Sequence, residues 1–196
     1  MNIGIDFDGV LIDSERLFKY YADFYSYFEL GGRLRKHNDN VKQQKCFEWS
    51  ENEKQKFFKK YVPLATMSAP FLTCAKEILT KLKQEGHKLF IVTARNNDCY
   101  HKEIEQAHIR IRELGINFDY IYTGPENKYE VCKRLGVDVL VDDNPDIIKQ
   151  FIGKKLFAIF FQNTVNHKFN AKNVLTANSW VDVYRKIRFL EEKRTS

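Results

Sequence analysis

Short apolar runs alternate with longer amphipathic stretches along this chain of 196 residues. A run of about four to eight apolar residues indicates a buried strand, whereas apolar positions that recur every three or four residues indicate a helix with one buried face. Strands and helices that alternate in this way favour an α/β fold, a doubly wound, Rossmann-like parallel sheet. The pattern predicts strands at residues 1–5, 88–93, 120–122, 137–141 and 156–161.

Helices are predicted between these strands, because glycine and proline residues mark where they end or begin. Gly86, Gly115 and Gly136 each follow an amphipathic stretch, and Pro145 stands where a short helix can start. Pro70 is expected in the first turn of another helix. The predicted helices cover residues 71–85, 98–114, 128–135 and 145–152, and a C-terminal amphipathic helix carries Val181, Tyr184, Ile187 and Leu190.

Residues 14–70 interrupt this alternation, and we expect them to form a small helical cap inserted directly after the first strand. Residues 1–13 and 71–196 would then form the α/β core. A first cap helix is predicted over residues 14–28, which Gly31-Gly32 follows. Its hydrophobic side chains recur at helical spacing, with Leu17, Tyr20 or Tyr21, Phe24, and Tyr27 or Phe28 on one face.

The second half of the cap has a clear helix start. Ser50 and Glu53 have the spacing of a capping box, and Pro63 is expected to end the helix that they open, near Tyr61. Residues 33–45 are polar, and we expect a loop or a mobile helix there.

Cysteine spacing and hydropathy indicate a cytoplasmic protein that does not associate with membranes. The four cysteines lie far apart and form no C-x-x-C pair, which is typical of reduced thiols. No apolar stretch approaches the length of a membrane span, and residues 1–30 lack the pattern of a secretory leader. The alternative is an organellar protein whose leader has been removed. The cysteines are Cys46, Cys74, Cys99 and Cys132.

The net charge of +6 is concentrated in the cap segment. Residues 14–70 hold eleven Lys and Arg against seven Asp and Glu. A basic surface beside an anion-binding cleft would steer phosphorylated molecules toward it. The alternative is a solvated helical face without a partner. We expect a small phosphorylated metabolite as partner, and the basic tail gives no reason to expect nucleic acid.

Two carboxylates at the end of the first strand are the strongest sign of chemistry. Asp6 and Asp8 lie two residues apart, so in extended backbone they point to the same side and repel each other. A site that binds a hard cation and attacks phosphorus needs this pair, one as ligand and nucleophile and the other as proton shuttle. The alternative is a solvated strand end that runs into a turn at Gly9.

Polar groups also follow two other predicted strands. One strand ends in Thr93-Ala94-Arg95, and another ends in Asp142-Asp143. Lys128 opens a helix, where its positive charge opposes the helix dipole. That cost is understandable if an anion binds at this helix start; a solvent-facing lysine is the alternative. Parallel α/β sheets bind ligands at the carboxyl ends of their strands. The sequence therefore predicts one site built from all these groups.

This set of motifs resembles the haloacid dehalogenase superfamily, in its phosphatase branch. The family pattern is D-x-D-G, a strand-terminal Thr or Ser, a Lys, and a strand that ends in paired acids. In this chain the pattern falls on Asp6, Asp8 and Gly9, then on Thr93, Lys128, Asp142 and Asp143. The resemblance covers residues 1–13 and 71–165.

The resemblance and the charges together imply a role for each group. Asp6 would be the nucleophile and Asp8 the general acid and base, while Thr93, Ala94, Arg95 and Lys128 would bind the phosphoryl group. Mg²⁺ is the expected cofactor, because the available donors are oxygens. Its ligands would be Asp6, the Asp8 backbone carbonyl and Asp143, with Asp142 either a further ligand or a partner that orients Asp143 and Lys128.

A looser resemblance concerns the substrate. The short aromatic cap and the stretches 90–95 and 115–120 resemble bacterial relatives of the 5′(3′)-deoxyribonucleotidases, which implies hydrolysis of nucleoside monophosphates. Cap aromatics could stack on a base, or they could simply form the core of the cap. The candidates for substrate contact are Phe18, Tyr21, Phe47 and Trp49; Arg95 and Asn96 could also reach a substrate.

Several other functions use similar groups. A sugar-phosphate phosphatase or phosphomutase would share the core, and a polynucleotide 3′-phosphatase would explain the basic surface. A receiver domain also places acids, Thr and Lys around Mg²⁺, but its paired acids come first in the chain, whereas here they come last. A silent phosphate-binding module is disfavoured because every chemical group is present. The sequence predicts no particular oligomeric state.

Overall fold

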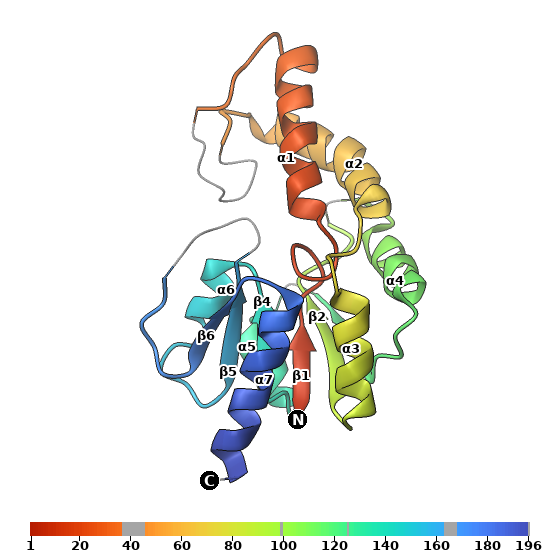
Figure 1. The fold of residues 1–196 in the computed structure, drawn as a ribbon. Helices are drawn as coiled ribbons and strands as arrows, with labels where there is room; N and C mark the ends of the chain where they lie inside the picture. Colours follow the sequence, from red (N-terminus) through yellow and green to blue (C-terminus); the bar gives the residue numbers. More distant parts are fainter. Residues whose placement is uncertain (37–45, 99, 125, 163–167, 196) are drawn as a thin grey trace.

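The computed structural model describes residues 1–36, 46–98, 100–124, 126–162 and 168–195. Its core is a parallel sheet of six strands in the order β3-β2-β1-β4-β5-β6, which confirms the predicted fold class (Figure 1). The sixth strand was not predicted from the sequence. The strands are β1 (Asn2–Ile5), β2 (Lys88–Thr93), β3 (Tyr120–Thr123), β4 (Val139–Asp142), β5 (Phe157–Phe161) and β6 (Val174–Ala177).

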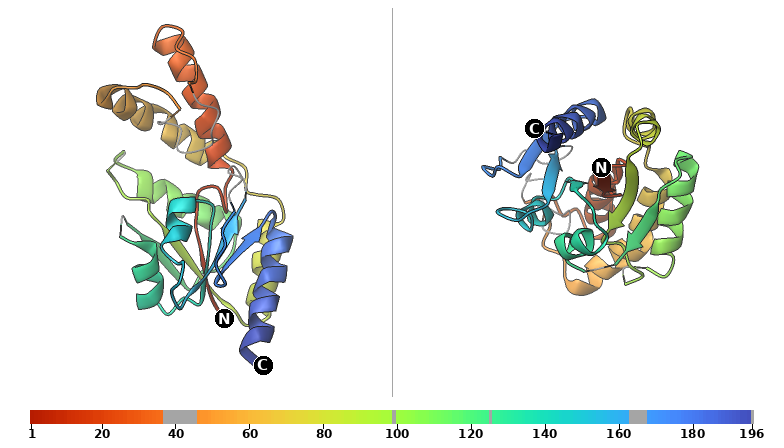
Figure 2. Two further views of the ribbon diagram at one scale, coloured as in Figure 1. Left: turned by 90° about the vertical axis from the view of Figure 1, so that its left-hand side faces the viewer. Right: turned by 90° about the horizontal axis from the view of Figure 1, so that it is seen from below.

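Helices cover both faces of this sheet. The helices α3 (Ala75–Gln84), α4 (Glu103–Leu114) and α7 (Trp180–Thr195) pack in one hydrophobic cluster with one face, and α5 (Lys128–Arg134) and α6 (Pro145–Lys149) pack on the other (Figure 2). Neighbouring residues of a strand point to opposite faces, so Ile91 faces the first cluster and Val92 the second. The apolar strand runs are therefore buried on both sides.

The cap segment (residues 14–70) lies beyond the carboxyl ends of the strands (Figures 1 and 2). It consists of α1 (Ser14–Phe24), which continues into a π-helical turn η1 (Tyr25–Glu29), and of α2 (Glu51–Ser68). The two passages that join the cap segment to the core run antiparallel: Ile12 pairs with Phe71, and the Asp13 N–H donates to the Pro70 carbonyl over 2.9 Å.

The capping box at Ser50 and Glu53 is present as predicted. The prediction that Pro63 ends this helix is wrong, because α2 continues to Ser68 with Pro63 in its interior. The buried side chains Phe57, Tyr61, Val62, Ala65 and Thr66 continue across the proline, so packing offsets the lost backbone hydrogen bond.

Two other helices begin later than predicted. Helix α3 starts at Ala75 rather than at residue 71, because Phe71 is paired with Ile12 and Cys74 has a left-handed φ of 63°. Helix α4 starts at Glu103 rather than at residue 98. Pro70 therefore lies in the passage to the core and not in a helix.

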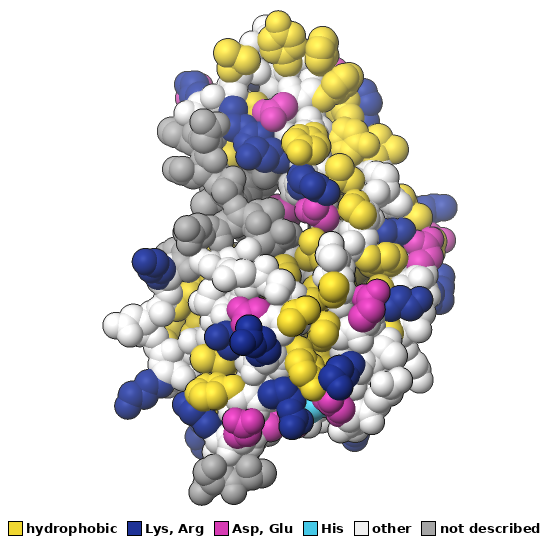
Figure 3. Space-filling view, viewed as in Figure 1, with side chains coloured by type: hydrophobic (Ala, Val, Ile, Leu, Met, Phe, Trp, Pro, Cys, Tyr) yellow, Lys and Arg dark blue, Asp and Glu magenta, His cyan; other side chains and the backbone are white. Residues whose placement is uncertain are grey.

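The aromatic face predicted for the first cap helix is mostly exposed. Phe24, Tyr27 and Phe28 are 49%, 53% and 69% exposed, and hydrophobic side chains gather over this end of the molecule (Figure 3). Ala22 and Tyr25 are buried instead, and with Ser14 and Phe18 they define a buried face at ordinary helical spacing, different from the predicted one.

Other predictions concern residues that the structure describes in part. Residues 37–45 of the polar stretch and Cys99 lie outside the described residues. Cys46, Cys74 and Cys132 are free thiols. Within the described ranges, every helix is too short or too polar to cross a membrane.

Candidate functional site

Three neighbouring strands end where the candidate site begins. Asp6 follows β1, Thr93 is the last residue of β2, and Asp142 is the last residue of β4. The Asp6 N–H donates to the Val141 carbonyl over 2.9 Å, which continues the pairing of β1 with β4 and fixes where Asp6 leaves the sheet. The side chains of Asp6, Thr93 and Asp142 are all buried. They meet where the strand order reverses, which is where such sheets bind ligands.

A tight turn after β1 directs Asp8 to the same place. Gly9 has a φ of 69°, a conformation that glycine adopts at little cost. The indole N–H of Trp180 donates to the Val10 carbonyl over 2.9 Å and anchors the turn from α7. A Cβ atom at Gly9 would lie 1.9 Å from Oδ2 of Asp143. The turn and the Asp143 carboxylate are therefore in close contact.

Lys128 forms a buried ion-pair triad with two of the acids. It is the first residue of α5, whose N-terminus is capped by Asn127. Its Nζ atom lies 2.7 Å from Oδ1 of Asp6 and 2.7 Å from Oδ2 of Asp142. Burial disfavours the charge, but the two carboxylates raise the pKa of Lys128 above its usual value. The Asn144 N–H donates to Oδ1 of Asp142 over 2.9 Å, so both oxygens of Asp142 are engaged.

One lysine does not neutralise the acids gathered here. Burial raises the pKa of Asp6 to about 7, an effect that Lys128 opposes and the charge of Asp142 increases. Burial likewise raises the pKa of Asp143 well above its usual range, and the charge of Glu15 adds to the effect. Carboxylates held in this way are costly to keep charged unless a further cation is present.

The geometry of these acids fits a hard divalent cation. Asp6, Asp142 and Asp143 each offer a carboxylate oxygen, and the three oxygens lie within 4.8 Å of one another. Mg²⁺ prefers a few oxygen ligands and retains waters, whereas Zn²⁺ prefers His and Cys. These oxygen donors could hold a hard divalent cation, and they are not the donors that Zn²⁺ prefers.

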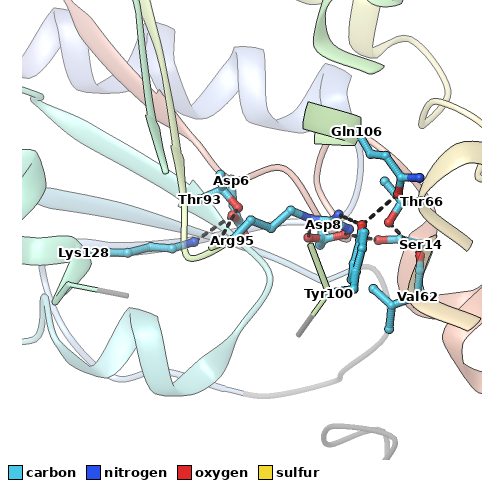
Figure 4. A network of polar contacts seen from close by, with 10 residues as sticks. All are labelled: Asp6, Asp8, Ser14, Val62, Thr66, Thr93, Arg95, Tyr100, Gln106 and Lys128. Atoms are coloured by element: carbon cyan, nitrogen blue, oxygen red, sulfur yellow. Dashed lines mark hydrogen bonds and ion pairs between the residues drawn. The ribbon is translucent and has the colours of Figure 1, made fainter. Parts of the chain in front are cut away.

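Asp8 is held by two neighbours (Figure 4). Its Oδ2 accepts a hydrogen bond from Nε of Arg95 over 2.7 Å, and its Oδ1 accepts one from Nη2 of Arg95 over 2.7 Å. The Ser14 hydroxyl, at the start of α1, also donates to Oδ1, over 2.6 Å. Burial favours the neutral acid, but Arg95 and these hydrogen bonds outweigh it and hold the pKa of Asp8 below its usual value.

A cavity of about 390 Å³ opens between the core and the cap segment at this point. Its floor is polar and its walls include the apolar side chains Phe57, Phe58 and Val62 of α2. Asp142 lies beneath the floor and is fully buried. Predicted site residues that line the cavity are Asp6, Asp8, Thr93, Ala94, Arg95, Lys128 and Asp143.

The four aromatic candidates for substrate contact all belong to or pack against one hydrophobic cluster of the cap segment, but they differ in whether they line the cavity. Phe18 lines the cavity. Phe47 and Trp49 stack on each other in the hydrophobic cluster of the cap segment, with ring centroids 5.0 Å apart, and Tyr21 packs against the same cluster. The structure places these three with the core of the cap segment, which is the alternative that the sequence left open.

Several residues of the cavity were missed by the sequence analysis. Glu15, Glu103, Asn144 and Ile147 line it, and Ser14 reaches Asp8. Asn144 directly follows the paired acids, which was an available signal. The others lie on helices whose relative positions the motifs do not specify.

Solved structures share this fold at low sequence identity. A haloacid dehalogenase-like hydrolase from Streptococcus pneumoniae has a TM-score of 0.71 at 14% identity, covering 95% of this chain and 97% of that protein. A β-phosphoglucomutase described as putative, from Bacteroides vulgatus, has a TM-score of 0.63 at 17% identity, covering 97% and 88%. The chain therefore has the haloacid dehalogenase-like fold.

Curated relatives and a family model match the sequence itself. A "Putative 5'(3')-deoxyribonucleotidase" from Chlorobaculum tepidum is 28% identical over 119 residues, which is 58% of this chain and 54% of the relative. A "Putative nucleotidase" from Bacillus cereus is 23% identical over 123 residues, 62% of this chain and 64% of the relative. The chain thus matches about half to two thirds of these relatives' length.

The family match extends further than either relative. The model described as "5' nucleotidase, deoxy (Pyrimidine), cytosolic type C protein" matches residues 1–194, and with it the strand-end acids, Thr93 and Lys128. The chain therefore belongs to this nucleotidase family, which confirms the looser resemblance seen in the aromatic cap and the stretches 90–95 and 115–120.

Proposed function

We propose that this protein is a Mg²⁺-dependent phosphomonoester hydrolase that acts on nucleoside monophosphates through an aspartyl-phosphate at Asp6. The observation that carries the proposal is the single cavity where Asp6, Asp8, Lys128 and Asp143 meet. A nucleophile, a second acid, a cation and a metal-binding carboxylate are the groups that phosphoryl transfer to a carboxylate requires. The family match and the names of the relatives support a nucleotide substrate.

The Mg²⁺ ligands in this proposal are Asp6, Asp143 and the backbone carbonyl of Asp8. Asp142 would orient its neighbours rather than bind directly, because both of its oxygens are engaged by Lys128 and Asn144. When bound, the ion would offset the repulsion between the carboxylates and the phosphate dianion.

The reaction has two steps. An Asp6 oxygen attacks phosphorus and the bond to the leaving oxygen breaks, while Asp8, whose pKa the negative charge of the bound phosphate would raise, gives that oxygen a proton. Asp8 then takes a proton from the water that hydrolyses the aspartyl-phosphate. Thr93, the N–H groups of Ala94 and Arg95, and Lys128 would hold the phosphoryl oxygens.

The cap segment would close the substrate side of the cavity. We propose that residues 14–70 form this cap on a core of residues 1–13 and 71–196, and that the protein is cytoplasmic, in agreement with the family description. Phe18, Phe57 and Phe58 provide the apolar wall against which a base could lie.

A substrate panel tests the proposal. We expect phosphate release from deoxyribonucleoside and ribonucleoside monophosphates to exceed that from sugar phosphates and from 3′-phosphorylated oligonucleotides, measured as kcat/KM with Mg²⁺ present. Preference for sugar phosphates by a wide margin would contradict the nucleotide assignment but leave the phosphatase chemistry intact. Preference for oligonucleotide ends, lost in higher salt, would support the polynucleotide phosphatase instead.

The metal requirement gives a second prediction, with a matched pair of variants. Excess chelator should stop phosphate release, and added Mg²⁺ should restore it. Gly9→Ala should raise the Mg²⁺ concentration for half-maximal activity by about tenfold or more, because its Cβ would displace Asp143.

Gly86→Ala is the control, since Gly86 has a similar φ of 84° but no atom within 4 Å of the added Cβ. Both variants place alanine at a similar positive φ, so the backbone strain is similar. They differ in that only the Cβ at residue 9 would clash with Asp143. Equal Mg²⁺ requirements in the two variants, or full activity in chelator, would contradict the proposed metal site.

A further inference from the structure

Arg95 is committed to Asp8 on one edge of its guanidinium group. Nε and Nη2 each donate to a different oxygen of Asp8 over 2.7 Å. The arginine side chain is 4% exposed, and its guanidinium carbon lies 5.0 Å from the centre of the Phe7 ring. This paired arrangement is the strongest geometry that an arginine and a carboxylate can form.

The other end of the guanidinium is held by a second polar group. Nη1 of Arg95 donates to the Tyr100 hydroxyl over 3.3 Å, and that hydroxyl donates to Oε1 of Gln106 on α4 over 2.9 Å. The side chain of Thr66, on α2, is a further hydrogen-bond partner of Tyr100. Figure 4 shows this network running from Asp8 to the place where the cap segment meets α4.

We propose that Arg95 is a positioning residue for Asp8, and that Tyr100 holds Arg95 in place for this task. The inference rests on the proposed function and assigns Arg95 a role other than phosphoryl binding. The edge that would chelate a phosphate is already paired with Asp8. Thr93, Lys128 and the backbone N–H groups remain to hold the phosphoryl oxygens.

The orientation of Asp8 matters to only one part of the first step. In the substrate complex the phosphate charge would favour the protonated form of Asp8, against the effect of Arg95. As the bond between phosphorus and the leaving oxygen breaks, Asp8 transfers this proton to that oxygen, and the new bond to phosphorus forms from Asp6. An alcohol such as a nucleoside is a poor leaving group without this proton, whereas p-nitrophenolate leaves as a stable anion. Misplacing Asp8 should therefore slow the hydrolysis of alkyl phosphate esters far more than that of aryl phosphate esters.

The test compares kcat/KM of two substrates in Arg95→Gln. For a nucleoside 5′-monophosphate we expect a fall of about 100-fold or more, the usual contribution of a general acid. For p-nitrophenyl phosphate we expect a change of only a few-fold, and KM for either should change little. Because kcat/KM reports the first step, slower hydrolysis of the aspartyl-phosphate does not obscure the comparison.

Tyr100→Phe removes only the hydroxyl. It should change the ratio of the two kcat/KM values in the same direction as Arg95→Gln, but by a smaller factor. Arg95→Lys keeps the charge without the paired geometry, so it should behave like Arg95→Gln and serves if the latter does not fold. Arg134→Gln and Tyr184→Phe, which remove exposed contacts of residues that do not line the cavity, should leave the ratio of the two kcat/KM values unchanged.

Other outcomes would overturn the inference. An equal loss on both substrates with a raised KM would make Arg95 a phosphoryl-binding residue, and an equal loss with unchanged KM would make its role structural. In either case Asp6-dependent release of phosphate by the unsubstituted enzyme would keep the proposed function. Failure of that enzyme on both substrates would reject the proposed function itself.

Discussion

Asp6→Asn should lower the rate of phosphate release by roughly 10⁴-fold or more, the scale seen when a nucleophile is removed. The amide has the shape of the carboxylate but neither its nucleophilicity nor its charge. It also removes one of the two carboxylates that we propose as metal ligands, Asp6 and Asp143. The measurement is the steady-state rate of phosphate release from a nucleoside monophosphate with Mg²⁺.

The fold should survive this change, because Lys128 keeps its ion pair with Asp142. We expect the free energy of unfolding of Asp6→Asn without metal to equal or exceed that of the unsubstituted protein, since one buried charge has been removed. Asp182→Asn, on α7, controls for a general effect of losing an acid. Substantial turnover by Asp6→Asn would exclude Asp6 as the nucleophile.

Lys128→Met should reduce both activity and stability. Removing the lysine leaves Asp6 and Asp142 buried without their shared cation. Breaking a buried ion pair in this way typically costs about 3–5 kcal/mol. The matched control, Lys149→Met, breaks an exposed pair with Asp146 that is worth at most about 1 kcal/mol. Denaturant unfolding without metal measures both.

The pH dependence of this loss has a definite sign. Burial already raises the pKa of Asp6 in the folded protein to about 7, against an ordinary value near 4. A group whose pKa is raised by folding contributes stability below its unfolded pKa and loses it as the pH rises through the folded value. Without Lys128 the folded pKa should rise further. The cost of Lys128→Met should therefore be larger at pH 8 than at pH 5.

Added Mg²⁺ should recover part of this stability at the higher pH, since it would restore positive charge among the same acids. The role given to Lys128 would be contradicted if Lys128→Met lost no more unfolding free energy at pH 8 than Lys149→Met. It would also be contradicted if the loss in Lys128→Met grew toward acid pH.

The polar core of the site could be predicted because parallel strands align their ends. Once Asp6, Thr93 and Asp142 are each assigned to the end of a strand in one sheet, the topology brings them together. These residues are far apart in the sequence, and it is the pattern of apolar runs that predicts their convergence. The fold class could be predicted from the same runs.

The contacts of Asp8 could not be predicted in this way. Arg95 follows Thr93 in a loop, and Ser14 belongs to the first turn of α1, so their approach to Asp8 depends on loop and helix geometry. The strand β6 was missed because its apolar run is short: Val174 and Leu175 are followed by Thr176. The prediction that the helix ends at Pro63 was wrong because the packing of α2 outweighs the local backbone preference of proline.

The cap segment joins the core through two adjacent passages, paired at Ile12 and Phe71 and bridged by the hydrogen bond from Asp13 to Pro70. Its two ends are thus held together by the core itself. Lengthening, shortening or exchanging the residues between them adds little entropy cost, which grows only slowly with loop length. In this architecture the inserted segment can therefore change during evolution while the sheet, and the strand-end residues that it positions, stay the same.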